Sequence, residues 1–420
     1  MSDLIDELEW RGLIKQHTDL ETLRKALNET QVTFYCGFDP TAASLHHGHL
    51  VQLIMMRHLQ LAGHHPIALV GGATGLIGDP RMTQERQLHD KATVAEWVER
   101  LKAQIEKFLD FEGDNPARMV NNLDWTEPLS AIDLLRDLGK NFRMGTMLAK
   151  DAVARRLQSE EGISFTEFSY QILQANDFLQ LYRKYGATLE TGGNDQWGNL
   201  VGGMDLIHKI EGADVHVMTT PLITKSDGTK FGKSEGGAIW LDPEMLSPYA
   251  FYQFWLNVED ADVVHFLKVF TFLPREEIEE LERQTAENPG ARAAQRALAE
   301  AVTTLVHGES ETERVKEASA ALFGRGDLRA VDGKTLVAAT SDLPRAAVTV
   351  DRTTILDLLV DSGLEKGIGA AKRTIASGGA YINNEKVSEE NRTITSEDVL
   401  PGDVVLFRRG KRQLGVGTLS

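Results

Sequence analysis

Short apolar segments that end at glycines alternate with helical stretches through the first half of the chain, and this alternation narrows the possible folds most. Residues 32–37 and 67–72 each have the composition of a buried strand and stop at glycine. Residues 48–61 and 94–109 carry apolar side chains at helical spacing. Further strand-like segments lie at residues 118–120, 188–191 and 215–218. This pattern predicts a doubly wound, parallel α/β sheet, whose ligands bind at the carboxyl ends of the strands.

The second half of the chain is organised differently. From about residue 242 the pattern is helical, and residues 324–350 are mixed and contain several glycines, which predicts a linker. The last seventy residues combine a basic helical stretch at 370–377 with strand-like segments. We therefore expect an α/β domain, a helical domain, a linker and a small α+β domain. Their expected bounds are 1–223, 224–323, 324–350 and 351–420.

Charge limits the classes of function. The chain has 420 residues, with 45 Lys and Arg against 62 Asp and Glu, which gives a net charge of −17. Residues 351–420 hold ten basic and ten acidic side chains, so the whole negative excess lies in the first 350 residues. A nucleic acid would therefore need a local basic patch, and the charge distribution favours the C-terminal part.

Several further classes are excluded by composition. The single cysteine, Cys36, allows no disulfide framework and no cysteine-based zinc site. The N-terminus is acidic and amphipathic, whereas a secretory signal begins with basic residues and continues with an apolar stretch. No run approaches the roughly eighteen apolar residues that a membrane span needs. We expect a cytoplasmic protein with no membrane contact, no protein-bound metal and no organic cofactor.

The motif Leu45-His46-His47-Gly48-His49 stands at the expected start of a helix. His46 and His49 are three residues apart, so they lie on one face of that helix. The helix N-terminus offers N–H groups and a positive dipole end to phosphates, and Gly48 would let an adenine ring approach the backbone. Taken alone, the motif also fits a histidine-rich helix cap without a catalytic role.

A second motif, Lys230-Phe231-Gly232-Lys233-Ser234, follows the last strand of the expected sheet. Two lysines and a hydroxyl on a glycine-containing loop can hold a triphosphate and stabilise its developing charge. By itself this stretch also fits a solvated, mobile basic loop. The two motifs together resemble the paired signatures of class I aminoacyl-tRNA synthetases: His-x-Gly-His near the first strand and Lys-x-x-Lys-Ser after the last.

Four further stretches resemble bacterial tyrosyl-tRNA synthetases, and with them the resemblance extends along nearly the whole chain. They are YCGFDPT at 35–41, GGATGLIGDP at 71–80, FTEFSYQILQAND at 165–177 and GGNDQWGN at 192–199. The resemblance implies a Rossmann-like catalytic domain, an α-helical domain and a small α+β, S4-like RNA-binding domain. It also implies the activity: tyrosine is activated with ATP and transferred to tRNA(Tyr).

Matched residue by residue, the resemblance implies a role for each site residue. For tyrosine, these are Tyr35 and Asp177 at the phenol, Asp79, Tyr170 and Gln174 at the ammonium group, and Gln196 near the carboxylate. For ATP, they are Cys36, Gly37, Asp39, Gly48, Gly193, Asp195 and Ser234. For the reacting phosphates, they are Thr41, His46, His49, Arg86, Lys230 and Lys233. For tRNA, they are Lys372, Arg373, Arg408, Arg409, Lys411 and Arg412.

The chemistry of these side chains supports a tyrosine site separately. A buried ammonium group needs an anion such as Asp79. A Tyr–Asp pair can both donate to and accept from a phenol. Tyr170, Gln174 and Asp177 are spaced i, i+4, i+7 and so share one helix face. Without the other motifs, the same face could simply be a polar one turned to water.

The resemblance also implies partners and leaves three positions open. Mg²⁺ would arrive with ATP, bound chiefly by phosphates and water, and the protein would be a homodimer with an interface near residues 132–138. His47, Gln52 and Glu190 depart from the family pattern, with effects that the sequence does not define. Alternative functions are a tryptophanyl enzyme of the same class, a small-molecule nucleotidyltransferase, and an RNA-binding protein without catalysis. The Tyr35–Asp177 pair, the C-terminal module and the retained Lys230, Lys233 and Asp195 argue against them.

Overall fold

The computed structural model describes residues 3–80, 87–160, 162–229, 231–232, 238–410 and 413–419. The chain divides into two compact units. The first comprises Met1–Met245 and Val258–Ala301, and the second comprises Leu246–Asn257 and Val302–Ser420.

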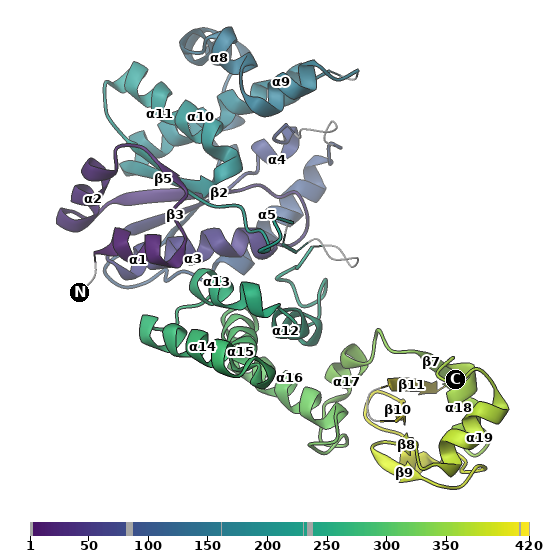
Figure 1. Cartoon of the computed structure of the whole chain (residues 1–420). Helices are drawn as coiled ribbons and strands as arrows, with labels where there is room; N and C mark the ends of the chain where they lie inside the picture. The colour runs from purple at the N-terminus through teal and green to yellow at the C-terminus, as the bar shows by residue number, and fades with distance from the viewer. Residues whose placement is uncertain are drawn as a thin grey trace. The chain divides into compact units, whose positions relative to one another are not determined.

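The first unit contains a six-stranded sheet with helices on both faces (Figure 1). Its strands are β1 (Gln16–His17), β2 (Thr33–Phe38), β3 (His65–Val70), β4 (Arg118–Asn121), β5 (Ala187–Gly193) and β6 (His216–Thr220). Its longer helices are α1 (Leu4–Arg11), α2 (Leu20–Glu29), α3 (His47–Leu61), α5 (Lys91–Ile105), α10 (Phe165–Tyr185), α11 (Trp197–Glu211), α13 (Asp260–Phe270) and α14 (Arg275–Glu287). Its short helical elements are α4 (Thr74–Ile77), α6 (Leu123–Thr126), α7 (Ala131–Asp133), η1 (Leu134–Leu138), η2 (Gly139–Asn141), α8 (Met144–Leu148), α9 (Asp151–Leu157), η3 (Asn194–Gln196) and η4 (Pro289–Ala291).

The sheet has the strand order β1-β6-β5-β2-β3-β4. Strands β2 to β6 pair in parallel, and only β1 runs antiparallel, against β6. The order changes direction between β2 and β5, which is the switch point of a doubly wound sheet. The predicted fold class is therefore confirmed. The two-residue edge strand β1 was not predicted, because its residues, Gln16 and His17, are polar and exposed.

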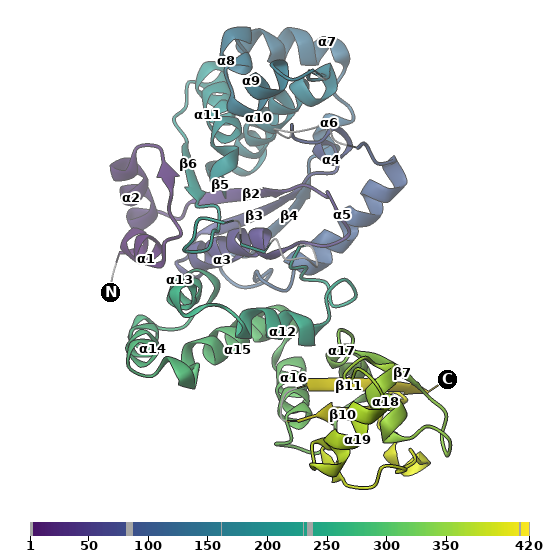
Figure 2. The same cartoon turned by 45° about the vertical axis from the view of Figure 1, so that its right-hand side comes forward.

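Helices α10 and α11 cover one face of this sheet, and α3 and α5 cover the other (Figures 1 and 2). One apolar cluster joins buried side chains of β2, β3, β5 and β6 to those of α10 and α11. Both faces are packed, and β2 and β3 are accordingly rich in apolar residues, as is usual for buried parallel strands. Because this core is tightly packed, the backbone just before the end of each central strand is held in one position.

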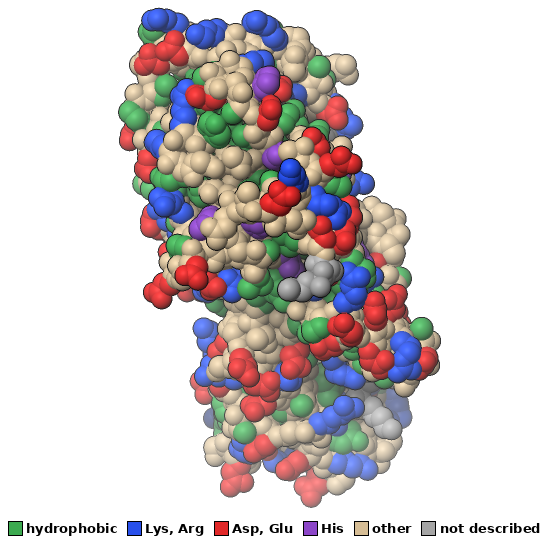
Figure 3. All heavy atoms as spheres, turned by 90° about the vertical axis from the view of Figure 1, so that its left-hand side faces the viewer, with side chains coloured by type: hydrophobic (Ala, Val, Ile, Leu, Met, Phe, Trp, Pro, Cys, Tyr) green, Lys and Arg blue, Asp and Glu red, His purple; other side chains and the backbone are tan. Residues whose placement is uncertain are grey.

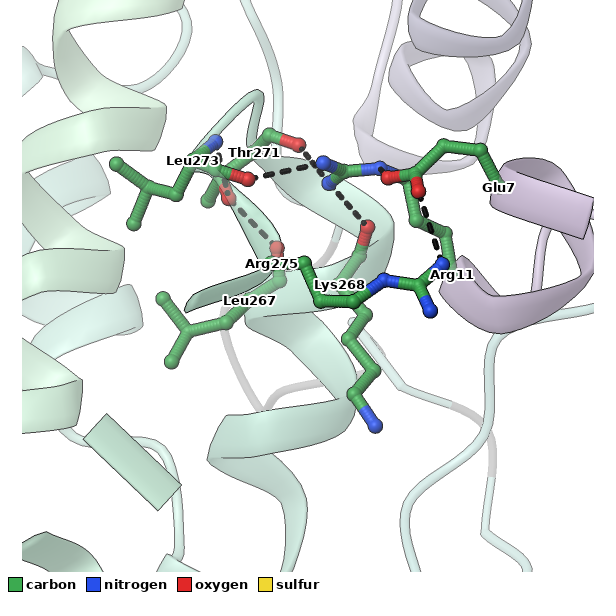
Figure 4. Close-up of polar contacts among 7 residues, drawn as sticks. All are labelled: Glu7, Arg11, Leu267, Lys268, Thr271, Leu273 and Arg275. Carbon is green, nitrogen blue, oxygen red and sulfur yellow. Dashed lines mark hydrogen bonds and ion pairs between the residues drawn. The ribbon is translucent and has the colours of Figure 1, made fainter. Parts of the chain in front are cut away.

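The N-terminal helix α1 is joined to α13 by one buried arginine (Figure 4). The Arg11 guanidinium donates to the carbonyl oxygens of Lys268, Thr271 and Leu273 at 3.2, 2.8 and 2.9 Å. It also pairs with Glu7 at 2.8 Å. The last carbonyls of a helix have no partner within the helix. Arg11, which lies close to the N-terminus of the chain, supplies hydrogen-bond donors to carbonyls at the C-terminal end of α13.

The second unit contains a five-stranded sheet with the order β7-β11-β10-β8-β9. Its strands are β7 (Arg345–Val348), β8 (Ala380–Ile382), β9 (Glu385–Val387), β10 (Val404–Arg409) and β11 (Gln413–Leu419). Its helices are α12 (Pro248–Leu256), α16 (Glu309–Leu322), α17 (Gly333–Ala339), α18 (Ile355–Asp361) and α19 (Ile368–Ala376), with η5 (Ser396–Asp398). Helix α15 (Ala293–His307) begins in the first unit and ends in the second.

Residues 324–350, which the glycine content predicted as a linker, are part of this packed unit. Leu328, Val331 and Leu336 are buried with side chains of α16, β10 and β11. Strand β7 pairs in parallel with β11, from Arg345 opposite Val416 to Val348 opposite Leu419. Glycines reduced the apparent periodicity, and the close approach of Gly333 to the backbone of Gly402 shows why one of them is needed, since a Cβ there would collide.

Across the residues that the structure describes, no helix is long and apolar enough to cross a membrane. The same residues contain no group of three or more His, Cys, Asp or Glu side chains placed to hold a metal ion.

Candidate active site

The predicted site residues of the first unit gather at the carboxyl ends of β2 and β5, on either side of the switch in strand order. Tyr35, Cys36 and Gly37 belong to β2, and Asp39 follows it directly. Gly193 is the last residue of β5, and Asp195 and Gln196 lie in the short helix that follows. Because β2 and β5 are adjacent and parallel, these two loops lie at the same edge of the sheet.

The first motif forms the N-terminus of α3. His46 is the N-cap: its Nδ1 accepts from the Gly48 N–H at 3.0 Å, and His49 Nδ1 accepts from the His46 N–H at 3.2 Å. The two rings stack with centroids 4.0 Å apart. Burial lowers the pKa of His46, and burial with the two neighbouring histidines lowers that of His49 further. Both imidazoles are therefore neutral near pH 7, and since Nδ1 accepts, each proton sits on Nε2 as a donor.

The second motif contacts the first through its described residues, Phe231 and Gly232. His47 Nε2 lies 3.1 Å from the Phe231 carbonyl oxygen. Further along the chain, the His47 N–H donates to the Ile239 carbonyl, and the Leu241 N–H donates to the Leu45 carbonyl, both at 2.9 Å. Four of the residues predicted to act on phosphates or ATP, Arg86, Lys230, Lys233 and Ser234, lie outside the described residues.

The predicted phenol-binding pair is buried behind the strands. The Tyr35 hydroxyl has no hydrogen bond of ordinary geometry within the described part of the chain. The Asp177 carboxylate accepts from Asn122 Nδ2 at 2.9 Å and from Trp125 Nε1 at 2.8 Å. Burial raises the pKa of Asp177 to about 7, while these two donors act in the opposite direction. The pair thus combines an acceptor held by two donors with a buried hydroxyl whose nearest polar partner is the Glu190 carboxyl.

Glu190 adds a third acid to this region. It faces Tyr35 across the β2–β5 pair, because the two residues are register partners and both are buried. Burial raises the pKa of the Glu190 carboxyl to about 8, and the nearby Asp177 charge acts in the same direction. Burial, followed by the Glu190 charge, also raises the pKa of Tyr35 well above its ordinary value. A neutral Glu190 is therefore the form that this environment favours near pH 7.

Of the three predicted ammonium-binding residues, Asp79 lies at the turn that follows α4, and Tyr170 is close enough to be affected by its charge. The Asp79 carboxylate accepts from Gln196 Nε2 at 2.9 Å and from Asn199 Nδ2 at 3.1 Å. The Tyr170 hydroxyl donates instead to Asp39, at 2.7 Å. The Oε1 atom of Gln174 is buried without a hydrogen bond within the described residues. Tyr170, Gln174 and Asp177 share one face of α10, as their spacing predicted.

A chain of hydrogen bonds links the ends of this site. Thr74 Oγ1 donates to Asp39 at 2.6 Å, and Asn122 Nδ2 lies 2.9 Å from both Thr74 Oγ1 and an Asp177 carboxylate oxygen. Asp39, predicted to bind ATP, is thereby connected to Asp177, predicted to bind the phenol. Gly71 leaves the room for this, because a Cβ there would collide with Asp39 and Thr74.

Sequence reasoning missed Asn122, Trp125 and Lys150. Asn122 follows the carboxyl end of β4 and could have been found by the rule that polar residues at strand ends line a site. Trp125 carried no signal apart from being aromatic. Lys150 Nζ donates to Asn199 Oδ1 at 3.1 Å, and burial lowers its pKa to about 8 although Asp79 and Asp205 oppose this. No motif marked Lys150, since it comes from a loop far from both signatures.

The remaining predicted ATP residues differ in exposure. Gly37, Thr41 and Asp195 are exposed, and Gly48 and Gly193 are partly exposed. Cys36 is buried, and burial raises the pKa of its thiol to about 12, so it remains a neutral side chain. Gln52, one of the departures from the family pattern, donates to Thr220 at the end of β6. Its side-chain amide therefore lies near the carboxyl ends of both β6 and β5, beside Gly193.

The predicted tRNA-binding residues belong to the second unit, and three of the four that the structure describes have partners there. Lys372 pairs with Glu390 at 2.8 Å, and Arg409 pairs with Glu365 at 2.7 Å. Arg408 lies over the Tyr381 ring, 4.4 Å from its centroid. Arg373 is exposed on α19. Lys411 and Arg412 lie outside the described residues.

Comparison with known proteins defines the class. The family described as tRNA synthetases class I (W and Y) matches residues 27–324. The domain described as tyrosine--tRNA ligase SYY-like C-terminal matches residues 335–415. The fold and both signature motifs of the first unit therefore belong to a class I aminoacyl-tRNA synthetase.

Individual relatives narrow this to one family. The tyrosine--tRNA ligase of Streptomyces coelicolor is 61% identical over 415 residues, which cover 99% of this chain and 98% of the relative. That of Bifidobacterium longum is 57% identical, over 98% of this chain and 96% of the relative. A C-terminally truncated mitochondrial tyrosyl-tRNA synthetase of Aspergillus nidulans is 31% identical, with a TM-score of 0.70, over 77% of this chain and 95% of that one. The chain belongs to the tyrosine--tRNA ligase family.

Proposed function

We propose that this chain activates L-tyrosine with ATP and transfers the tyrosyl group to the 3′ end of tRNA(Tyr). The observation that carries the proposal is the position of the Tyr35–Asp177 pair. Tyr35 belongs to β2, the strand that leads into the loop before the first motif, and the Asp177 carboxylate is close enough for its charge to act on the Tyr35 hydroxyl. A donor and an acceptor for a phenol, an anion for an ammonium group and a phosphate-binding helix end together match tyrosine and ATP.

In the proposed first step, the tyrosine carboxylate attacks the α-phosphorus of ATP, and the bond to pyrophosphate breaks. Tyrosyl-adenylate and pyrophosphate are the products. A carboxylate is already a nucleophile, so the protein need supply no general base for this step. Its contribution is to orient the two substrates and to stabilise the charge that develops on the phosphates.

The roles of the described residues follow from their chemistry. Nε2–H groups of the neutral His46 and His49, with Thr41, would donate to phosphate oxygens. Gln196 would stand near the tyrosine carboxylate, and Asp195 would accept from the ribose hydroxyls, beside Gly193 and Cys36. Lys230, Lys233 and Arg86 would stabilise the departing pyrophosphate. Mg²⁺ would enter as part of the ATP substrate, with phosphate and water ligands.

At the tyrosine end, the substrate would complete contacts that are open or exchangeable. Its phenol would donate to Asp177 and accept from Tyr35. Its ammonium group would lie near Asp79, Tyr170 and Gln174, replacing contacts that Asp79 now makes with amide groups. An amino acid without the hydroxyl would leave the buried Tyr35–Asp177 pair unsatisfied, which is the basis for rejecting phenylalanine.

In the second step, the terminal ribose hydroxyl of tRNA would attack the carbonyl carbon of the adenylate, releasing AMP. We propose that the second unit includes an S4-like domain that contacts the tRNA. On the face in Figure 3 acidic and basic side chains are interspersed, so contact would need local basic groups such as Arg373. This two-step reaction would take place in the cytoplasm.

We further propose that the protein is a homodimer. Six large apolar side chains are exposed within a short stretch of the first unit: Ile132, Leu135, Met144, Leu148, Leu157 and Phe165. The most exposed of these are Phe165 at 72% and Ile132 at 66%. Exposed apolar groups gathered in this way are typical of a protein–protein interface. Sedimentation of the full chain should give a species of about twice the 46.5 kDa chain mass, and a monomer at micromolar concentration would contradict this proposal.

The experiment that tests the function is amino-acid-dependent exchange of labelled pyrophosphate into ATP, measured without tRNA for each of the twenty amino acids. We expect exchange with tyrosine alone. Exchange with tryptophan would keep the class and overturn the assignment of the phenol site. Failure with every amino acid would overturn the proposed activity.

A further inference from the structure

His47 belongs to the first signature motif, and its side chain contacts the second. Its Nε2 atom lies 3.1 Å from the Phe231 carbonyl oxygen, and since a carbonyl only accepts, Nε2 carries the proton. The two rings meet edge to face, with centroids 5.6 Å apart and planes at 89°. One side chain therefore makes a polar and an aromatic contact to the same residue, 184 positions away.

Gly232 completes this contact. It has a φ of +78°, and a Cβ built on it would lie only 2.0 Å from the Cε1 atom of His47. The imidazole thus occupies the space that the side chain of any other residue at position 232 would need. Phe231 in turn packs against Phe266 and Phe270 of α13, with centroid distances of 4.2 and 6.3 Å.

The segment after the second motif is attached to the first motif as well. His46 and Trp240 form an antiparallel β-bridge, supported by hydrogen bonds from His47 N–H to the Ile239 carbonyl and from Leu241 N–H to the Leu45 carbonyl. Before the motif, the Ser226 N–H donates to Asp262 of α13 at 2.7 Å. Described residues on both sides of Phe231 and Gly232 are therefore held by hydrogen bonds of their backbone N–H and C=O groups. Phe231 itself donates its N–H to the Ile223 carbonyl at 3.3 Å and is contacted from α3 by the His47 side chain.

We propose that His47 is a positioning residue: by holding Phe231 and Gly232 against the N-terminus of α3, it sets where the flanking lysines of the second motif act on ATP. In sequence, Lys230 and Lys233 directly flank these two residues. His47 itself touches no reacting atom in this proposal, which rests on the proposed activation of tyrosine with ATP. An apolar residue at this position could pack against Phe231 but could not donate to its carbonyl.

The neutral imidazole suits this role. His47 Nδ1 is buried and has no hydrogen-bond partner among the described residues, so a second ring proton would be left unpaired there. Burial accordingly lowers the pKa of His47 to about 4. The contact is therefore intact throughout the neutral range.

The test compares His47→Leu with His47→Gln in the full-length protein. Leucine keeps apolar contact and removes the donor, whereas the glutamine amide can place an N–H near the position of Nε2. Single-turnover formation of tyrosyl-adenylate should slow by about tenfold in His47→Leu and stay within about threefold of wild type in His47→Gln. Tyrosine binding, measured by equilibrium dialysis without ATP, should stay within about twofold in both variants.

A second pair of variants keeps the proposal testable if a single substitution perturbs folding. Gly232→Ala introduces both an unfavourable φ and a collision with the imidazole, whereas Gly232→Ala in the His47→Ala background retains only the unfavourable φ. We expect the loss of adenylate formation caused by Gly232→Ala to be at least about fivefold larger with His47 present than with His47→Ala. Additive effects would overturn the proposal.

The outcomes separate this inference from the proposed function. Wild-type protein that fails to form tyrosyl-adenylate would overturn the function itself. Active wild type with an equally active His47→Leu variant would overturn the positioning role alone. A His47→Leu variant that loses tyrosine affinity as strongly as rate would also overturn it, because the defect would then extend over the whole site.

Discussion

The Tyr35 hydroxyl is a buried polar group whose partner we expect to be the substrate. Tyr35→Phe removes the interaction of the Tyr35 hydroxyl with the neighbouring buried Glu190 carboxyl and leaves the two donors to Asp177 in place. We expect its free energy of unfolding to stay within about 1 kcal/mol of wild type or to rise. The preference for tyrosine over phenylalanine, measured as the ratio of kcat/KM values in pyrophosphate exchange, should fall by about tenfold.

Trp125→Phe is a matched control for Tyr35→Phe. It removes a buried donor to Asp177 on the other side of the carboxylate, so it should lower stability as well as tyrosine binding. A Tyr35→Phe variant that unfolds more easily than Trp125→Phe, yet discriminates as well as wild type, would show that the Tyr35 hydroxyl is structural.

Glu190 should make tyrosine binding depend on pH. Its pKa is raised by burial to about 8, so it is protonated near pH 7 and ionises above. The ionised form would place a second negative charge beside Asp177, next to the phenol. We therefore expect the tyrosine dissociation constant to rise by about tenfold per pH unit above pH 8. In Glu190→Gln this rise should be absent. Because ionisation of free tyrosine affects wild type and variant equally, the difference between the two proteins reports on Glu190.

The same shift predicts how Glu190 affects stability. A raised pKa means that the unfolded chain releases this proton near its ordinary value of 4.5 while the folded protein keeps it until about 8. Between these values the folded state binds more protons, so stability falls as pH rises through this window and is level above it. Thermal unfolding should show that Glu190→Gln gains stability relative to wild type from pH 5 to pH 8. A constant difference across this range would contradict the assignment.

Single residues show how far sequence alone can reach into this site. The shared helix face of Tyr170, Gln174 and Asp177 followed from spacing, because helix geometry fixes it locally, whereas the N-cap role of His46 was not predicted. The hydrogen bonds of Asp177 to Asn122 and Trp125 did not, since they join segments whose proximity depends on the order of β4 and α10 around the sheet. The catalytic roles of all these residues remain predictions.

At the scale of elements, Arg11 should be the most sensitive contact between α1 and α13. Arg11→Met keeps the aliphatic volume but leaves the carbonyls of Lys268, Thr271 and Leu273 without this donor. Glu7 would keep its ion pair with Arg275 at 3.0 Å, which limits the damage. We expect a loss of about 2–4 kcal/mol in the free energy of unfolding, measured by urea denaturation.

The control for Arg11 is Arg24→Met. Arg24 pairs with Asp3 and Asp6 at the surface, and solvent-exposed ion pairs contribute little. Its removal should cost less than about 1 kcal/mol. Equal losses in the two variants would mean that the helix-end carbonyls are not what Arg11 stabilises.

Helices and strands were predicted correctly where one hydrophobic periodicity runs through a long segment. They were missed where the segment is short or interrupted by glycines. Helix α3 begins at His47, within one residue of its expected start at 48, since a long apolar pattern at helical spacing carries a repeated signal. The short elements α8 and α9 were missed, because five and seven residues give less than two full turns of periodicity. Residues 324–350 were assigned as a linker for a similar reason: α17 and β7 are short and lie among glycines, and their burial comes from contacts with β10 and β11.

At the scale of the whole molecule, tyrosine activation and tRNA contact should be separable, because the residues proposed for them lie in different compact units. Arg373 is exposed on α19, so Arg373→Ala should leave tyrosine-dependent pyrophosphate exchange unchanged. Removing one phosphate contact should raise the KM for tRNA by about three- to tenfold at low salt and reduce the salt dependence of tRNA binding by about one unit of slope.

Lys372→Ala provides the comparison within the same helix. Lys372 is paired with Glu390, so tRNA binding would have to replace that ion pair, and the net effect of removing Lys372 should be smaller than for Arg373. If both variants charge tRNA as wild type does, α19 does not face the tRNA, and the basic residues of β10 become the stronger candidates. If Arg373→Ala instead slows exchange without tRNA, the two activities are coupled through the chain, and separate roles for the two units would have to be abandoned.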